Sequence, residues 1–238
     1  MTKLKILSGG AAQGLVASLA AKFKEQTNFD IEGEFGAVGA MAGKLRAGTK
    51  ADLVILSSAL IDELARENLV IGGSISDLGL VETAIAVRAA DPPVRVRDAA
   101  SLKNVLLEAD VIFVPDTRMS TAGIHVARVL EQLGIAETVA KRLKIYPNGA
   151  TAMSHLAESR AARPIGCTQA TEIINTRGVK PSGSLPPGYD LSTLYTAAIA
   201  TGATHRKQSQ VLLDLLIGKE QQPLRTEAGF LEARNQLQ

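Results

Sequence analysis

MTKLKILSGGAAQG (residues 1–14) is the stretch that decides the fold. Its Leu4–Leu7 run is short and apolar, which predicts a β-strand. The small residues Ser8–Ala11 follow, and a helical pattern begins directly after them. A strand that turns through small residues into a helix leaves unpaired backbone N–H groups at the helix N-terminus, where the helix dipole adds partial positive charge. The stretch therefore predicts an anion site.

The composition narrows the class of ligand. Hydrophobic residues make up 46% of the 238 residues and charged residues 21%, an ordinary balance for a globular protein. The formal net charge is +2 with no long basic run, whereas a nucleic-acid site needs clustered Lys and Arg, so no nucleic-acid partner is expected. Aromatic residues are 3% and Trp is absent, which argues against stacking platforms for sugars or bases. Small polar side chains and the backbone should hold the ligand.

The cellular location stays open at this level. Cys167 is the single cysteine, so no internal disulfide indicates the redox compartment. No segment reaches the roughly 18 apolar residues of a membrane span. The N-terminus has no apolar signal region or cleavage site. We expect a cytoplasmic protein for the chain as written, or a periplasmic one if a signal has been removed.

The opening turn has two counterparts further along the chain. Phe29–Phe35 alternates like a strand and ends at Gly36–Gly39, a second small-residue turn before a helix predicted from Ala40 to Ala47. Ala51–Leu56 is a nearly continuous apolar run, typical of a buried parallel strand, and Ser57 follows as a predicted N-cap. Three such units in succession predict a parallel sheet with its loops along one edge, beyond which ligands bind.

Residues 84–192 carry a second α/β pattern. The strand Val111–Val114 leads through Asp116–Thr121 into a helix, and Thr168–Gln169 is predicted to open another. Pro181–Gly188 is rich in turn residues and predicts a loop. We predict an α/β fold of two lobes, residues 1–83 with 193–238 and residues 84–192, hinged around a shared cleft.

The order of these elements resembles a known family. The motifs that carry the resemblance are Ser8-Gly9-Gly10, Phe35-Gly36-Ala37-Val38-Gly39, Ala51-Asp52-Leu53-Val54-Ile55 and Gly166-Cys167-Thr168-Gln169-Ala170-Thr171-Glu172-Ile173. They are similar to the type II periplasmic solute-binding proteins, in the molybdate-binding-protein-like branch. The resemblance implies two α/β lobes around a small anion and an ABC transporter permease as partner. A related branch resembles aconitate isomerase.

The resemblance also suggests where a ligand would bind. In molybdate binders a Ser in each of the first two loops holds the oxyanion, and the matching positions here are Ala11 and Val38. A Tyr of the second lobe also contributes in the family, and the nearest match here is Gln169. The missing hydroxyls favour a small oxyanion or carboxylate that is not strictly molybdate. The candidate ligand-binding residues on the predicted loops are Ser8, Gly9, Gly10, Ala11, Ala37, Val38, Ser57, Arg118, Ser120, Thr121, Asn148, Gly149, Thr168 and Gln169.

Several of these residues have a purely structural alternative. Arg118 either pairs with a carboxylate or is a solvated surface charge. Ser120 and Thr121 cap their helix, bind ligand or do both. The three histidines (His125, His155 and His205) show no paired metal spacing and suit packing better than general-base catalysis. Cys167 is expected to be a small buried side chain, and Asp52 and Asp116 to be structural.

Two functions remain open. The first is a monomeric solute-binding protein for a small anion, with no cofactor and no metal. The second is a cofactor-free isomerase of a small unsaturated polycarboxylate, which needs a base on one side of the allylic carbon and a proton donor on the other. The sequence does not single out that catalytic pair.

Overall fold

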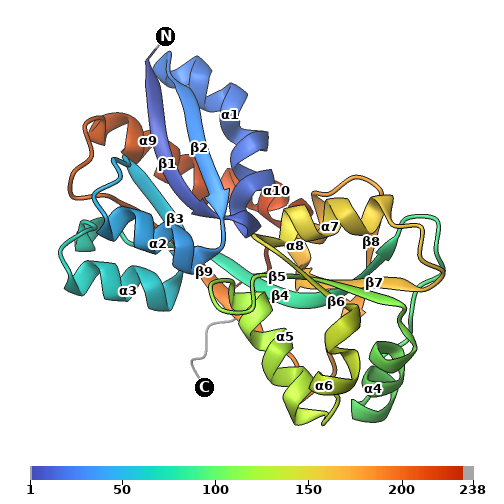
Figure 1. The fold of residues 1–238 in the computed structure, drawn as a ribbon. Coiled ribbons are helices and arrows are strands. Elements are labelled where there is room, and N and C mark those ends of the chain that lie inside the picture. Colours follow the sequence, from blue (N-terminus) through green and yellow to red (C-terminus); the bar gives the residue numbers. More distant parts are fainter. Residues whose placement is uncertain (1, 233–238) are drawn as a thin grey trace, which may run out of the picture. The chain divides into compact units, whose positions relative to one another are not determined.

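Two α/β units make up the computed structural model, which describes residues 2–232 (Figure 1). Unit 1 comprises the chain up to Val81 and from Thr193 onward, and unit 2 comprises Glu82–Ser192. The chain passes between them in two strands, β4 (Ser76–Arg88) and β9 (Ser192–Ile199).

Unit 1 is built on a sheet with the strand order β2-β1-β3-β9. The strands β1 (Lys3–Gly9), β2 (Asp30–Gly36) and β3 (Leu53–Ser57) run parallel, and β9 pairs antiparallel with β3. Every residue of β3 is buried, because this central strand is covered on both faces. Parallel pairing places the carboxyl ends of β1–β3 at one edge, as the sequence predicts.

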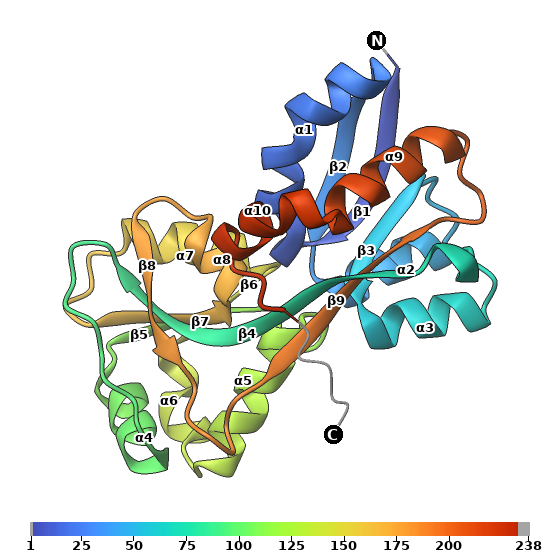
Figure 2. The same cartoon turned by 180° about the vertical axis from the view of Figure 1, so that it is seen from behind.

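The helices of unit 1 cover both faces of its sheet. Helices α1 and α9 lie on one face and α2 and α3 on the other (Figures 1 and 2). The α-helices are α1 (Gln13–Thr27), α2 (Val38–Arg46), α3 (Ser58–Arg66), α9 (Arg206–Ile217) and α10 (Gln222–Glu227), and the 3₁₀ helices are Gly10–Ala12, Gly72–Ser74 and Lys219–Gln221. Helix α2 begins at Val38, two residues before the predicted start. Val38 is therefore in the first turn of the helix.

Asp52 holds three segments of unit 1 together. Its Oδ2 accepts a hydrogen bond from the Lys5 N–H (2.9 Å). Its Oδ1 accepts from the Thr204 N–H (2.9 Å), the Thr204 hydroxyl (3.0 Å) and the His205 N–H (3.0 Å). Burial alone would raise the pKa of Asp52, but these hydrogen bonds outweigh it and lower the pKa below its ordinary value. The expectation that Asp52 is structural is confirmed.

The strands of unit 2 follow the order β4-β7-β5-β6, and β8 pairs with β4. Helices α7 and α8 cover one face and α4, α5 and α6 the other, each over a separate apolar core (Figures 1 and 2). The strands are β5 (Val111–Pro115), β6 (Leu143–Tyr146), β7 (Pro164–Gln169) and β8 (Val179–Ser184). The helices are α4 (Ala99–Glu108), α5 (Thr121–Gln132), α6 (Ala136–Val139), α7 (Gly149–Glu158) and α8 (Ala170–Ile174), with a 3₁₀ turn at Ala140–Arg142.

One of two predictions for unit 2 is wrong and the other is confirmed. The segment Pro181–Gly188 is not wholly a loop, because β8 runs through its first half. Pro181 is tolerated there because β8 pairs only with β4 among the described strands, and the register shifts between Ile85 and Ala86 opposite it. The helix predicted to open at Thr168–Gln169 is present: Gln169 ends β7 and is the N-cap residue of α8, which begins at Ala170.

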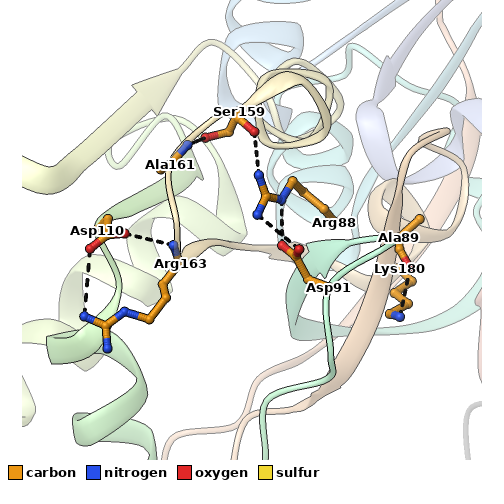
Figure 3. A network of polar contacts seen from close by, with 8 residues as sticks. All are labelled: Arg88, Ala89, Asp91, Asp110, Ser159, Ala161, Arg163 and Lys180. Carbon is orange, nitrogen blue, oxygen red and sulfur yellow. Dashed lines mark hydrogen bonds and ion pairs between the residues drawn. The ribbon is translucent and has the colours of Figure 1, made fainter.

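A polar network fixes the loops around the end of β4 (Figure 3). Arg88 donates from Nε and Nη2 to both oxygens of Asp91 (2.6 and 3.0 Å) and from Nη1 to the Ser159 carbonyl (2.7 Å). The Arg163 N–H donates to Asp110 Oδ2 (2.8 Å). This bidentate pairing gives the proline-containing loop after β4 a fixed geometry.

Replacing Asp52 by Asn tests its role. We expect Asp52→Asn to lower the free energy of unfolding at pH 7 by about 1–3 kcal/mol, because the amide NH₂ would face either Lys5 N–H or the two amides of Thr204 and His205. A lowered pKa in the folded state stabilises the fold above the ordinary value of 3.8, and this stabilisation is lost as the pH falls through the folded-state value. Urea unfolding at pH 7 and pH 3 should show the two proteins converging at the lower pH. The exposed variant Asp62→Asn is the control, and equal effects of the two variants would contradict the assignment.

Candidate functional site

Three helix N-termini lie along one edge of the unit 1 sheet. The strands β1 and β2 are in register from Lys3–Asp30 to Gly9–Gly36, and β3 lies on the other side of β1. Each strand passes directly into a helix: β1 into the 3₁₀ turn Gly10–Ala12 and α1, β2 into α2, and β3 into α3. The turns predicted from separate sequence motifs are therefore brought to the same edge. We call this edge, from Gly9–Ala12, Ala37–Val38 and Ser57–Ser58, the strand-end site.

The side chains at the strand-end site leave these helix ends uncapped. The N-cap residues Gly9, Ala37 and Ser57 make no side-chain capping hydrogen bond, and no acidic residue lies in the first turns that follow. Ser57 is at the predicted N-cap position, but its hydroxyl does not cap, which corrects that part of the prediction. The first N–H groups of a helix have no acceptor within it, so they stay available for an anion.

Backbone groups are what this site offers, because its side chains are buried. Ser8 is fully buried, and its hydroxyl donates to the Gly9 carbonyl (2.9 Å). Ala11, Ala37 and Val38 are also buried. Gly10 at the start of the 3₁₀ turn is partly exposed. The sequence predicts an anion held by backbone N–H groups. This arrangement fits that prediction better than it fits an anion held by side-chain hydroxyls.

Gly9 brings two of the predicted turns into contact. A Cβ at Gly9 would lie 2.7 Å from Val38 Cγ1 and 3.0 Å from Tyr195 Cε1, closer than side chains normally approach. Glycine is therefore required for the end of β1 to pack against α2 and β9. Tyr195 of β9 was not singled out from the sequence, since only the fold places it beside Gly9.

In unit 2 the loop before α5 is shaped by Asp116. One oxygen of Asp116 accepts hydrogen bonds from the N–H groups of Arg118 (2.7 Å) and Met119 (2.9 Å), as the structural interpretation of this residue predicts. Ser120 is at the N-cap of α5 but makes no side-chain capping hydrogen bond, and the first turn from Thr121 holds no acidic residue. The capping alternative for Ser120 is therefore wrong. The side chain of Arg118 is exposed beside this open helix end.

The turn at α7 is different because a carboxylate of the protein fills it. Glu172 on α8 is buried, and the Thr168 hydroxyl donates to its Oε2 (2.5 Å). A Cβ at Gly149 would overlap both of these oxygens, which shows how closely the carboxyl group lies against the α7 end. Burial raises the pKa of Glu172, while the Thr168 hydroxyl and the N–H groups of Gly149, Gln169 and Ala150 oppose the rise without cancelling it.

Four predicted site residues of unit 2 are therefore engaged within the protein. Asn148 caps α7 by accepting from the Thr151 N–H (2.8 Å). Gly149 and Thr168 contact Glu172, and the Gln169 side chain is buried. Glu172 itself was missed from the sequence, because it follows Gln169 in a short apolar helix and nothing local shows that its carboxyl group is buried.

Buried hydroxyls form a second group that the sequence did not reveal. Thr83, Thr171 and Thr193 have buried side-chain oxygens without a hydrogen-bond partner in residues 2–232. Thr83 on β4 is paired with Gln169 on β7, so one of these unpartnered hydroxyls lies next to a predicted site residue. A buried hydroxyl without a partner is costly to the fold and marks a place where a water molecule or a ligand group can bind.

The remaining candidate groups have structural roles. Burial raises the pKa of Cys167 to about 12, which confirms it as a small buried side chain. His125 Nε2 lies 2.7 Å from the Tyr189 carbonyl, His155 stacks on Tyr146, and His205 meets Phe29 edge-on. Within residues 2–232, no group of three or more His, Cys, Asp and Glu side chains could hold a metal ion, and no helix is long and apolar enough to span a bilayer.

One family of known proteins matches nearly the whole chain. The family model described as bacterial extracellular solute-binding protein matches residues 4–231. The chain belongs to this family. Among its relatives, aconitate isomerase from Pseudomonas sp is 24% identical over 229 residues, which cover 92% of this solute-binding protein and 84% of the isomerase.

Solved structures have the same fold. The periplasmic molybdate-binding protein of Azotobacter vinelandii is similar with a TM-score of 0.80 at 18% identity, covering 96% of this chain and 98% of that chain. The sulfate-binding protein SubI from Mycobacterium tuberculosis H37Rv is similar with a TM-score of 0.75 at 18% identity, covering 99% of this chain and 88% of that chain. The predicted α/β fold of the periplasmic-binding-protein type, and the resemblance stated from the motifs, are confirmed.

Glu172 makes the solute-binding protein sensitive to pH in a defined direction. A carboxyl group whose pKa is raised in the folded state favours the fold below its ordinary value of 4.5, and this contribution is lost as the pH rises through the folded-state value. We therefore expect Glu172→Gln to gain stability relative to the wild type as the pH increases from 4 to 8. Urea unfolding at several pH values measures this difference. Glu158→Gln, at the exposed end of α7, should leave the profile unchanged, and a difference that shrinks with rising pH would contradict the assignment.

Proposed function

We propose that this solute-binding protein binds a small anion on the backbone N–H groups of the strand-end site in unit 1. One observation carries the proposal: the helix N-termini that follow β1, β2 and β3 have neither a side-chain cap nor an acidic residue in the first turn. An isolated helix start of this kind is common, whereas a set of them at one sheet edge concentrates unpaired donors and positive potential. An anion is the ligand that accepts hydrogen bonds from these donors and is attracted by this potential.

The chemistry of the site favours a small oxyanion or carboxylate over a strict molybdate site. Ala11 and Val38 present buried methyl groups where hydroxyl donors would add strong hydrogen bonds to a charged ligand. In unit 2, Arg118 stands exposed at the uncapped start of α5, and its planar guanidinium suits a carboxylate. Two of the similar solved structures are a molybdate-binding protein and a sulfate-binding protein, which supports an anion as the class of ligand.

The proposal includes a partner and a location. A monomeric binding protein that delivers its anion to an ABC transporter permease would work outside the cytoplasm. The family description as extracellular solute-binding protein supports this part of the proposal.

Gly10→Asp is the sharpest test of the strand-end site. The new carboxylate would sit at an open helix N-terminus, where negative charge stabilises a helix, so the fold should be kept while the anion is displaced. We expect affinity for sulfate, molybdate or citrate, whichever binds the wild type, to fall by about tenfold or more. Isothermal titration calorimetry at constant ionic strength measures it.

Gly10→Asn is the matched control, with the same shape and no charge. It should bind within a few-fold of the wild type. If the Asp and Asn variants bind the anion equally well, the strand-end site is not where the ligand binds. Thermal unfolding of both variants shows whether the fold is kept.

The relationship to aconitate isomerase favours a second candidate function, a proton shift in an unsaturated tricarboxylate. This chemistry needs groups that exchange protons near neutral pH. Burial raises the pKa of Glu172, which is the direction that a carboxyl group needs in order to exchange protons nearer neutral pH. The isomerase function therefore uses the same class of ligand as the binding function and adds catalytic turnover.

Heavy water separates a binder from an isomerase. The protein is incubated with cis-aconitate or trans-aconitate in deuterated buffer, and NMR follows the position of the double bond and the uptake of deuterium. A binder leaves both unchanged. An isomerase exchanges deuterium, and we expect Arg118→Ala to abolish this exchange while Arg128→Ala on the exposed face of α5 does not.

A further inference from the structure

Unit 1 has a polar hollow at the end of its sheet opposite the strand-end site. Strand β1 runs from Lys3 to Gly9, so the side chains near Lys3 lie at the far end of the strand from the strand-end site. A hollow of about 230 Å³ lies there, and we call it the lysine pocket. It is lined by Lys3, Lys5, Lys50, Ala51, Asp52, Gly202, Thr204 and His205.

The fold brings the walls of the lysine pocket together through Asp52. Lys3 and Lys5 share one face of β1, because the residues between and after them, Leu4 and Ile6, are buried on the other. The chain just before β3 is held beside Lys5 by the Asp52 N–H donating to the Lys5 carbonyl (2.7 Å). The same carboxylate holds Thr204 and His205, so all three walls have a fixed spacing.

The charge of the lysine pocket is unbalanced. Three lysines and one aspartate line the pocket, so its lining carries a formal charge of +2 when His205 is neutral. The Asp52 carboxylate already accepts four hydrogen bonds from the protein. Lys3 Nζ lies 3.5 Å from Glu32 in an exposed pair, a kind of contact that contributes little. Lys5 and Lys50 make no ion pair among the described residues.

Helix α9 adds to this positive field. The helix begins at Arg206, directly after the pocket wall at His205, and runs for 12 residues. No acidic residue lies in its first turn, and its N-cap makes no side-chain capping hydrogen bond. Arg206 and Lys207 instead place further positive charge at the positive end of the helix dipole. The N–H groups of Thr204 and His205 just before the helix donate to Asp52, so this carboxylate is the acid at the helix end and the two cations of the first turn outnumber it.

We propose that the lysine pocket is a second anion site, for a doubly charged oxyanion of the phosphate class. A net charge of +2 matches a dianion, and flexible ammonium groups act as point charges that suit a tetrahedral oxyanion better than a flat carboxylate. The hollow is several times larger than the roughly 30 Å³ that one water molecule occupies, so it also has room for a group that carries the phosphate. This site is independent of the strand-end site.

The test is an amide NMR titration of the full chain with inorganic phosphate and, separately, with phenyl phosphate at constant ionic strength. We expect saturable shifts at Lys5, Thr204 and Lys207 in the low millimolar range or tighter. Tighter binding of phenyl phosphate identifies an ester as the ligand, and equal or tighter binding of inorganic phosphate identifies the free ion. Shifts that do not saturate with either compound overturn the proposal.

Matched variants locate the binding. Lys5→Gln with Lys50→Gln should weaken phosphate binding about tenfold, because two exposed charges are removed without disturbing the core. Lys141→Gln with Lys144→Gln, both exposed in unit 2, should leave it unchanged. Gly10→Asp should keep the phosphate-induced shifts at Lys5 and Thr204, which separates this site from the strand-end site. Equal weakening by both lysine pairs overturns the proposal in favour of general charge attraction.

Discussion

Every helix begins with backbone N–H groups that need a partner, and this constraint shapes both units. Where an end is structural, the chain provides the partner itself. Asp98 closes α4 with a capping box, Asn148 caps α7, and the Glu172 carboxylate lies against the same α7 end. Asp52 does the same for the turn before α9. The ends that follow β1–β3, and the start of α5, receive no such partner. What distinguishes the ends after β1–β3 is that three of them meet at one edge of the unit 1 sheet.

The positions of helices and strands follow closely from local signals in the sequence. Leu4–Leu7 and Ala51–Leu56 were recognisable as strands because apolar runs of that length between small residues bury well in a parallel sheet. Asp52 was correctly interpreted as structural, since a lone acid in an apolar run must find hydrogen bonds.

Errors arose where tertiary contacts decide the outcome. Ser57 and Ser120 occupy N-cap positions, but neither side chain makes a capping hydrogen bond. Pro181 is a residue type that favours loops, but it lies in the strand β8. On the outer side of an edge strand, a residue without an N–H loses no hydrogen bond to a neighbouring strand. Burial of Glu172 depends on Gly149 from another helix, and no window of sequence around Glu172 contains that information. Such features become visible only once the chain is folded.

The buried thiol has a practical consequence. Cys167 is 3% exposed, and burial raises its pKa to about 12, so almost none of it is thiolate at neutral pH. Maleimide and methanethiosulfonate reagents react with the thiolate of an accessible cysteine. A cysteine introduced on the surface would therefore be labelled selectively in the native sequence background. Fluorophores or spin labels could be attached in each unit, and ligand-induced motion could be followed without first removing the natural cysteine.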